Sequence, residues 1–159
     1  MVTIRPAEPR EAETVAGLIN AINSLDGPPP ELRMTASVVL RDLICDRPRA
    51  RLRVADFGAG PIAFATSAPL YDALRHADAL FLLDLYTAPA HRRRGAARAL
   101  LAELAAHAVA TGAGCLFWGV DDGDDAALLF YRAIGSVSEG RFSGEILEGE
   151  ALRALAGLA

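Results

Sequence analysis

The sequence predicts a mixed α/β fold, because its apolar residues change from a strand period to a helix period more than once. Residues 2–5 alternate in polarity, as in a strand, whereas the apolar residues of 12–22 recur at helical spacing. Two further strand-like runs, 52–57 and 61–67, flank the turn Gly58-Ala-Gly60 and therefore predict a β-hairpin.

A strand, a helix and a second strand follow one another in the middle of the chain, and this order predicts a parallel crossover. The run 80–86 is apolar, the Ala/Leu-rich helix after it ends near Thr111-Gly112, and 115–120 is predicted to be a buried strand. The segment 68–78, between the hairpin and this unit, is predicted to be a loop. The resulting α/β fold contains a mixed sheet and has α+β character.

The remaining elements are predicted from their boundary residues. Gly27 and Pro28–Pro30 end the first helix and force an extended loop. The other predicted elements are a helix over 37–45, a helix over 124–134 that Asp124 caps, a strand over 141–147 and a terminal helix over 150–158. Because the sequence has no linker or repeat, residues 1–159 are predicted to form a single domain.

Composition restricts the classes of function. Apolar residues make up 52% and charged residues 23% of the chain, which is typical of a globular protein. The net charge of −4 gives no support for binding to nucleic acid or to a membrane surface. Cys45 and Cys115 have no neighbours at metal-ligand spacing, so we expect free thiols, no metal and a cytoplasmic location. No leader and no apolar run of spanning length is present, so neither secretion nor membrane insertion is predicted.

The junction between the run 80–86 and the following helix predicts a site for a phosphate-bearing ligand. A Pro-containing turn delivers Arg92, Arg93, Arg94 and Gly95 to the start of the helix, where free backbone N–H groups bind anions. Gly95 lets the backbone approach a phosphate closely, and Ala96 and Ala97 are the next smallest residues. The alternatives are an ordinary turn glycine and a solvated run of arginines.

Several motifs together resemble a known enzyme family. The spacing Arg92-x-x-Gly95-x-Ala97 resembles the acetyl-CoA pyrophosphate loop of the GCN5-related N-acetyltransferases (GNAT). The order of motifs over 80–155 resembles the diamine (spermidine/spermine) N-acetyltransferase branch. The motifs are LDLYTAP at 83–89, HRRRGAA at 91–97, VDDGD at 120–124, FY at 130–131 and IGS at 134–136.

The resemblance implies a GNAT-type acyl-CoA N-acyltransferase fold, in which the sheet splays between strands 4 and 5 and holds acetyl-CoA in the split. The backbone N–H groups of Arg92, Arg93, Arg94, Gly95, Ala96 and Ala97 would hold the pyrophosphate. The backbone of Leu85, Tyr86 and Thr87 would pair with the pantetheine arm like an added strand. Asp124 stands where the family has an Asn that contacts CoA, and it is otherwise only a helix cap.

The resemblance also assigns catalytic roles for direct transfer to the neutral primary amine of a small molecule. Tyr131 would be the general acid that protonates the CoA thiolate, and the alternative is a packed tyrosine with its hydroxyl at the surface. Asp84 interrupts an apolar run, where an unpaired carboxylate is costly, so it either pairs with a cation or faces the active cleft. It is the candidate amine anchor or base-positioning residue. Tyr71, Asp72 and Glu139 are further candidate substrate contacts, although each carboxylate is also explained as a solvated charge.

Three departures from the family pattern leave a second class of function open. Leu83 replaces an acidic residue of the diamine branch, Gly123 replaces a Trp, and Asp124 replaces the Asn. They motivate a catalytically inactive acyl-CoA-binding sensor or interaction module as the alternative. An RNA-binding role lacks a basic face with interleaved aromatic residues. By family analogy, a homodimer is expected through exposed strand edges and the C-terminal segment.

Overall fold

The computed structural model describes residues 1–25, 27–140 and 143–157. The chain divides into two compact units, Met1–Val120 and Asp121–Ala159. The single domain over residues 1–159 stays a prediction.

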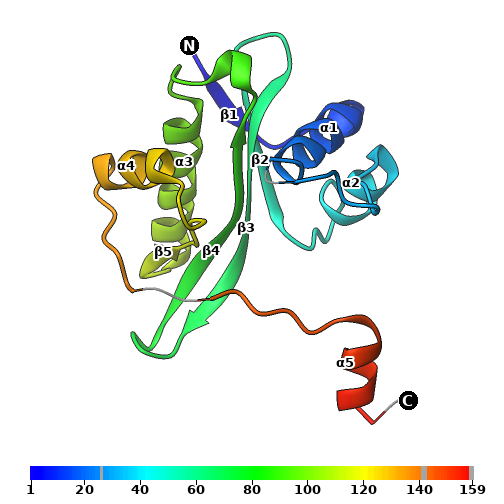
Figure 1. Cartoon of the computed structure of the whole chain (residues 1–159). Helices are drawn as coiled ribbons and strands as arrows, with labels where there is room; N and C mark the ends of the chain where they lie inside the picture. The colour runs from blue at the N-terminus through cyan, green and yellow to red at the C-terminus, as the bar shows by residue number, and fades with distance from the viewer. Residues whose placement is uncertain (26, 141–142, 158–159) are drawn as a thin grey trace. The chain divides into compact units, whose positions relative to one another are not determined.

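The first unit is built on a five-stranded mixed sheet with the strand order β1-β2-β3-β4-β5 (Figure 1). The first four strands are antiparallel, and β5 runs parallel to β4 after the crossover through the long helix. The strands are β1 (Thr3–Arg5), β2 (Arg51–Asp56), β3 (Pro61–Asp72), β4 (Ala77–Thr87) and β5 (Cys115–Phe117). The predicted mixed α/β fold and its parallel crossover are confirmed.

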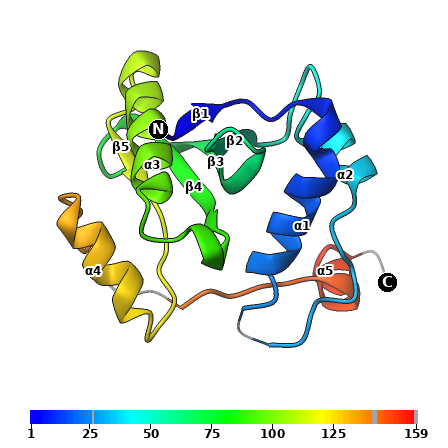
Figure 2. The same cartoon turned by 90° about the horizontal axis from the view of Figure 1, so that it is seen from above.

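Helices cover both faces of this sheet (Figure 2). On one face lie α1 (Ala12–Ile22), which follows the 3₁₀ turn Pro9–Glu11, and α2 (Ala36–Asp42). On the other face lies α3 (Ala96–Thr111). Helix α1 buries residues at helical spacing, which are Ala12, Val15, Ala16 and Ile19. They pack on Val54, Phe64 and Tyr86 of the sheet to form a hydrophobic core.

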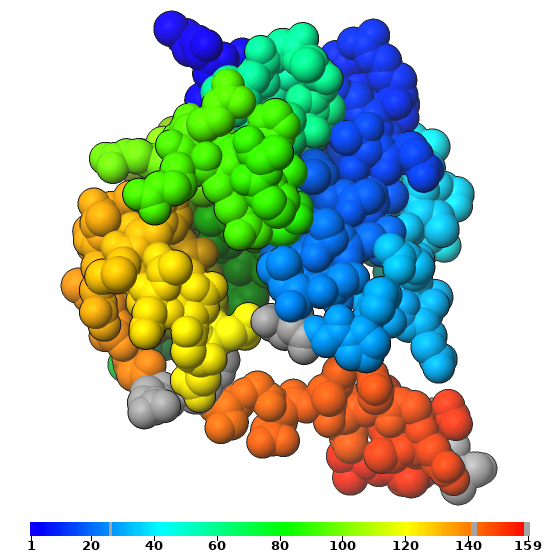
Figure 3. All heavy atoms as spheres, turned by 45° about the horizontal axis from the view of Figure 1, so that its top comes forward, coloured from blue at the N-terminus to red at the C-terminus, as the bar shows by residue number. Residues whose placement is uncertain are grey.

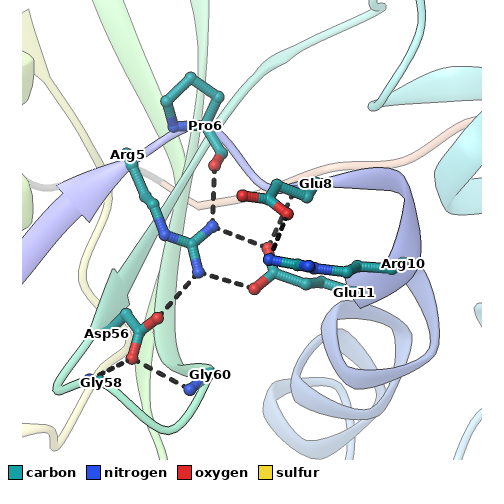
Figure 4. Close-up of polar contacts among 8 residues, drawn as sticks. All are labelled: Arg5, Pro6, Glu8, Arg10, Glu11, Asp56, Gly58 and Gly60. Carbon is teal, nitrogen blue, oxygen red and sulfur yellow. Dashed lines mark hydrogen bonds and ion pairs between the residues drawn. The ribbon is translucent and has the colours of Figure 1, made fainter.

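An ion-pair cluster joins β1 to the first helix and to the β2–β3 turn (Figure 4). The Arg5 guanidinium donates to both carboxylate oxygens of Glu11, at 2.8 and 2.6 Å, and to Oδ2 of Asp56 at 2.8 Å. Glu11 also accepts from the backbone N–H of Glu8, and Asp56 Oδ1 accepts from the N–H groups of Gly58 and Gly60. The cluster therefore ties the start of the first helix to the β1–β2 ladder and to the turn that follows β2.

The predicted loop over 68–78 is wrong. Residues Ala68–Asp72 continue β3 and pair with Ala77–Phe81 of β4, so only 73–76 form the turn. The residues of this hairpin tip are polar and exposed, so they lack the apolar alternation that predicts a strand. Pro69 also indicates the end of a strand, because proline cannot donate a hydrogen bond to the ladder. The carboxylate of Asp72 closes the turn by accepting from the N–H groups of Leu74 and Arg75.

Two other predicted elements are shorter than expected. Helix α2 ends at Asp42, three residues before the predicted end, and the Asp42 carbonyl accepts from the Arg49 N–H at 2.8 Å instead of continuing the helix. Strand β5 ends at Phe117, and its three residues are half-buried and not fully buried as predicted.

The second unit contains α4 (Asp125–Ala133) and α5 (Gly149–Leu155). Asp124 caps α4 as predicted, because its carboxylate accepts from the Ala127 N–H at 2.9 Å. The predicted strand 141–147 begins outside the described residues, and residues 143–147 form no strand, so that prediction is wrong for its described part. The terminal helix is confirmed, but it ends at Leu155, three residues before the predicted end, and the described residues 156–157 form a turn. No helix in the described part of the chain is long and apolar enough to span a membrane.

Candidate functional site

The connection from β4 to α3 adopts backbone conformations that few residues tolerate. Pro89–His91 form a 3₁₀ turn, Arg93 has a φ of 59°, and Gly95 caps α3 with a φ of 85°. In Figure 3 this bright green segment lies at the surface beside the teal β2–β3 turn. The sequence therefore places a sharp, exposed loop directly before a long helix.

Helix α3 begins without any side-chain cap. Gly95 provides no capping oxygen, and the first turn holds no acidic residue. The first hydrogen bond of the helix runs from the Ala99 N–H to the Gly95 carbonyl at 3.0 Å, so the N–H groups of Ala96 and Ala97 have no partner within the helix. Apart from Gly95 itself, its chain neighbours and the adjoining helix backbone, no atom of the described residues lies within 4 Å of the position that a Cβ of Gly95 would take. The arrangement is an open row of donors at the positive end of a helix dipole.

Two of the three arginines in this loop, Arg92 and Arg94, contact neighbouring residues. Arg92 Nε donates to the carbonyl of Thr87 at 3.2 Å. The Arg94 guanidinium lies 4.3 Å above the Phe57 ring, which fixes it by a cation–π contact. Among residues 1–25, 27–140 and 143–157, none of the three forms an ion pair with a carboxylate. Their charges are therefore not neutralised by the protein.

Strand β4 has an open edge just before this loop. Strand β5 pairs only with Ala79–Phe81, whereas β3 pairs with β4 as far as Thr87. Within the described residues, β4 therefore has a partner strand on one side only from Leu82 onward, which is the predicted splay between strands 4 and 5. Along Leu85, Tyr86 and Thr87, alternate backbone groups face this open side. The Tyr86 side chain packs in the core, so only its backbone is available there.

The side chain of Thr87 gives a second indication that a ligand belongs here. Its hydroxyl oxygen is buried and has no hydrogen-bond partner among the described residues. A buried hydroxyl without a partner is unfavourable, since it loses water without gaining another hydrogen bond. A polar ligand along the open edge of β4 would relieve this cost. The donors, the positive charges and the open edge together fit a long phosphate-bearing ligand with amide groups.

Asp84 lies on β4 at a β-bulge. The register passes from Thr66 opposite Asp84 to Ser67 opposite Leu82, which leaves Leu83 without a partner. The Thr66 hydroxyl donates a short hydrogen bond to Asp84 Oδ2. Within residues 1–25 and 27–120, the other oxygen, Oδ1, has no partner. Asp84 is half-buried, so this oxygen is the part of the side chain that can meet a substrate.

Tyr71 and Asp72 are not brought together with Asp84. They lie five and six residues beyond Thr66 on β3, which corresponds to roughly 17–20 Å along a strand. Asp72 binds the backbone of its own turn and forms an ion pair with Arg75, which lowers the pKa of the carboxyl. These contacts within the turn are sufficient to explain why an aspartate stands at position 72.

The other predicted site residues, Tyr131, Asp124 and Glu139, belong to the second unit. Tyr131 lies on α4, and burial raises the pKa of its phenol above the ordinary value of 10.0, with the Asp124 carboxylate adding to the increase. The phenol therefore keeps its proton at neutral pH. Glu139 is exposed and lies outside any helix or strand.

Sequence reasoning missed Thr66, Phe57 and the orphaned hydroxyl of Thr87. A polar residue inside the apolar run PIAFATSA was the only available signal for Thr66, because its partner lies 18 residues away. The described residues contain no group of three or more His, Cys, Asp or Glu side chains that could hold a metal ion.

A cavity of about 610 Å³ lies elsewhere in the first unit, at the end of β2. Its lining includes Leu43, Arg49, Arg51, Leu52 and His107, but neither Asp84 nor any residue of the β4–α3 loop. Arg51 and Arg53 of the lining both pair with Glu103, so a single carboxylate offsets part of their positive charge. The cavity is separate from the open edge of β4.

A known protein family matches the part of the chain that contains the β4–α3 loop. The model of the family described as Acetyltransferase (GNAT) family matches residues 19–135. No curated protein matches the sequence.

Solved structures share the fold at low sequence identity. An integron cassette protein from the mobile metagenome of V. cholerae is 19% identical with a TM-score of 0.78, covering 98% of this chain and 97% of its own. An aminoglycoside acetyltransferase from an uncultured soil metagenomic sample, in complex with sisomicin, is 16% identical with a TM-score of 0.71, covering 94% and 97%. A ribosomal-protein-alanine N-acetyltransferase from Brucella melitensis biovar Abortus is 20% identical with a TM-score of 0.70, covering 94% and 99%.

Proposed function

This chain is an N-acetyltransferase of the GNAT family, and on that basis we propose that it moves an acetyl group from acetyl-CoA to the primary amine of a small molecule. The observation that carries the proposal is the uncapped start of α3, which directly follows the open edge of β4. The first element suits a pyrophosphate, and the second suits an arm that contains amide groups.

The residues of the chain fit acetyl-CoA as follows. The backbone N–H groups from Arg92 to Ala97 hold the pyrophosphate, and the arginines add positive charge. The backbone of Leu85, Tyr86 and Thr87 pairs with the pantetheine arm, and the Thr87 hydroxyl gains a polar neighbour. Asp124 is a further candidate contact in addition to its role as the cap of α4. Acetyl-CoA supplies the activated thioester.

Two side chains handle protons and charge in the proposed reaction. Asp84 holds the amine through Oδ1, or holds the water that accepts the amine's proton. An ordinary primary amine needs about 4 kcal/mol to be neutral at pH 7, so such help matters. The amine nitrogen attacks the thioester carbonyl, a backbone N–H of β4 supports the developing negative charge, and the C–S bond then breaks. Tyr131 gives its proton to the departing sulfur.

The proposal extends to the amine acceptor, to a homodimeric assembly and to a cytoplasmic location. The motif order resembles that of the diamine branch, although Leu83 stands where that branch has an acidic residue, and Tyr71, Asp72 and Glu139 stay candidate acceptor contacts. Cys45 and Cys115 are free thiols, which supports a reducing cytoplasm. Exposed apolar residues in the second unit support a homodimer, and they are Leu129, Val137, Ile146, Leu147, Leu152 and Leu155. Sedimentation equilibrium at several protein concentrations tests this assembly.

Leu83 and Gly123, which depart from the family pattern, favour a second candidate: an acyl-CoA-binding sensor without transfer activity. Titration calorimetry with acetyl-CoA, followed by transfer assays on a panel of amines, separates the two. Micromolar binding that Gly95→Glu abolishes, together with amine acetylation, supports the enzyme. Binding without transfer to any amine supports the sensor. No binding by the parent protein would contradict both.

A further inference from the structure

The face of the sheet that carries Asp84 is apolar around it. Side chains of a strand alternate between faces, so Thr66 and Ala68 of β3 share one face. Their register partners Asp84 and Phe81 lie on that face as well. Phe81 pairs in turn with Phe117 of β5, and the centroids of the two rings are 5.7 Å apart. We call Asp84, Phe81 and Phe117 the acceptor strip.

Leu83 borders this strip and adds to its apolar character. It is the unpaired residue of the bulge, next to Asp84 in the chain, and 49% of it is exposed. Phe81 and Phe117 are only partly buried, so the strip presents two aromatic rings and an aliphatic side chain beside a single carboxylate. Between Tyr86 and Ala79 of β4, the register-defined residues on this face include one charged side chain, Asp84, and the next one, Asp72, lies six residues beyond Thr66 at the hairpin tip.

This chemistry discriminates between kinds of amine. A single carboxylate oxygen matches one ammonium group, and aromatic rings beside it favour a flat or branched apolar body. A second ammonium group over Leu83 or Phe81 would lose water without gaining a partner, which is costly. An acidic residue in place of Leu83 would accept such a charge, and this chain does not have one.

We propose that the acceptor is a primary amine with one positive charge on an aromatic or branched aliphatic body, and not a polyamine or an aminoglycoside. The inference rests on the proposed acetyl transfer and names its acceptor class. Asp84 holds the amine nitrogen, while Phe81, Phe117 and Leu83 pack against the body of the acceptor. Burial of that apolar surface supplies affinity that a polycation cannot gain here.

The test measures kcat/KM for acetyl transfer at saturating acetyl-CoA with 2-phenylethylamine, spermidine and kanamycin. We expect the parent protein to prefer 2-phenylethylamine over spermidine by at least tenfold. Leu83→Glu is expected to reduce that preference about tenfold, because it adds the missing carboxylate at an exposed position. Leu83→Gln is the matched control, of the same size but uncharged, and is expected to leave the spermidine rate low.

The outcomes separate this inference from the function on which it rests. Transfer that favours spermidine or kanamycin in the parent protein would overturn the inference and leave the acetyltransferase intact. An equal gain for spermidine in Leu83→Glu and Leu83→Gln would also overturn it, since charge would then not be the cause. Transfer to none of the amines would contradict both, and the titration with acetyl-CoA would show whether cofactor binding alone survives.

Discussion

Thr66 and Asp84 lie directly opposite each other in the β3–β4 ladder, and the threonine hydroxyl donates to one oxygen of the carboxylate. This contact occupies Oδ2 and turns Oδ1 away from Thr66. The bulge at Leu83 begins at the same position, so the carboxylate is held where the ladder is irregular. Thr66 is thereby a positioning residue for the proposed amine anchor.

Thr66→Val is therefore expected to lower kcat/KM for the amine about tenfold, while the Kd for acetyl-CoA stays unchanged. The substitution keeps the shape of the side chain but removes a hydrogen bond to a charged group, which contributes about 1.5 kcal/mol. Thr66→Ser restores the hydroxyl and should restore most of the rate. Steady-state kinetics on the three proteins check this, and loss of acetyl-CoA affinity in Thr66→Val would contradict it.

Gly95 and Gly112 form a matched pair at the two ends of α3. Their φ angles are 85° and 78°, and an added Cβ has open space at either position. Alanine at each site should therefore destabilise the fold by a similar amount, about 1 kcal/mol, because a side chain is strained at positive φ. Only Gly95→Ala is expected to weaken acetyl-CoA binding, by about tenfold, since only Gly95 lies beside the free N–H groups. Calorimetric titration and thermal melts of both variants check this, and equal weakening by Gly112→Ala would argue against the site.

Tyr131→Phe is expected to lower kcat at least a hundredfold with little change in the Kd for acetyl-CoA. A general acid must be protonated, and the pKa of Tyr131 is raised above 10.0. The alkaline fall in kcat should therefore lie above pH 10 in the parent protein and be absent from the residual rate of the variant. A pH profile of kcat from 7 to 11.5 measures this. An unchanged kcat in Tyr131→Phe would remove the acid role.

Features that depend on neighbouring residues could be predicted from the sequence, whereas features that depend on contacts across the sheet could not. Local patterns were sufficient for α1, for the cap at Asp124 and for the loop around Gly95, since each depends on residues within a few positions. The hairpin over 68–78 was misjudged, because its pairing is decided by contacts across the sheet and its exposed tip lacks an apolar alternation. Thr66 was missed for the same reason, since register alone places it opposite Asp84. The roles of Asp84 and Tyr131 came from resemblance and remain proposals.

The ion-pair cluster around Arg5 gives a prediction about stability. Arg5→Met keeps most of the apolar stem but leaves Glu11, which is only 8% exposed, without its cation. We expect the free energy of unfolding to fall by about 2 kcal/mol at pH 7, because a buried charge that loses its partner is costly. Urea unfolding measures this. Arg41→Met, which breaks an exposed pair with Asp42, is the control and should have a smaller effect.

The same cluster makes the stability depend on pH in a fixed direction. Arg5 lowers the pKa of Glu11 from its ordinary 4.5 and that of Asp56 from 3.8. The unfolded chain therefore binds more protons than the folded chain near pH 4, and the free energy of unfolding rises with pH there. The stabilisation is complete above pH 5 to 6 and is lost as the pH falls through 4.5 and below. Urea unfolding at pH 7, 5 and 4 should show a smaller loss in Arg5→Met than in the parent protein, because the variant has already lost the interaction that acid removes. An equal loss in both would mean that other carboxyl groups control the acid stability.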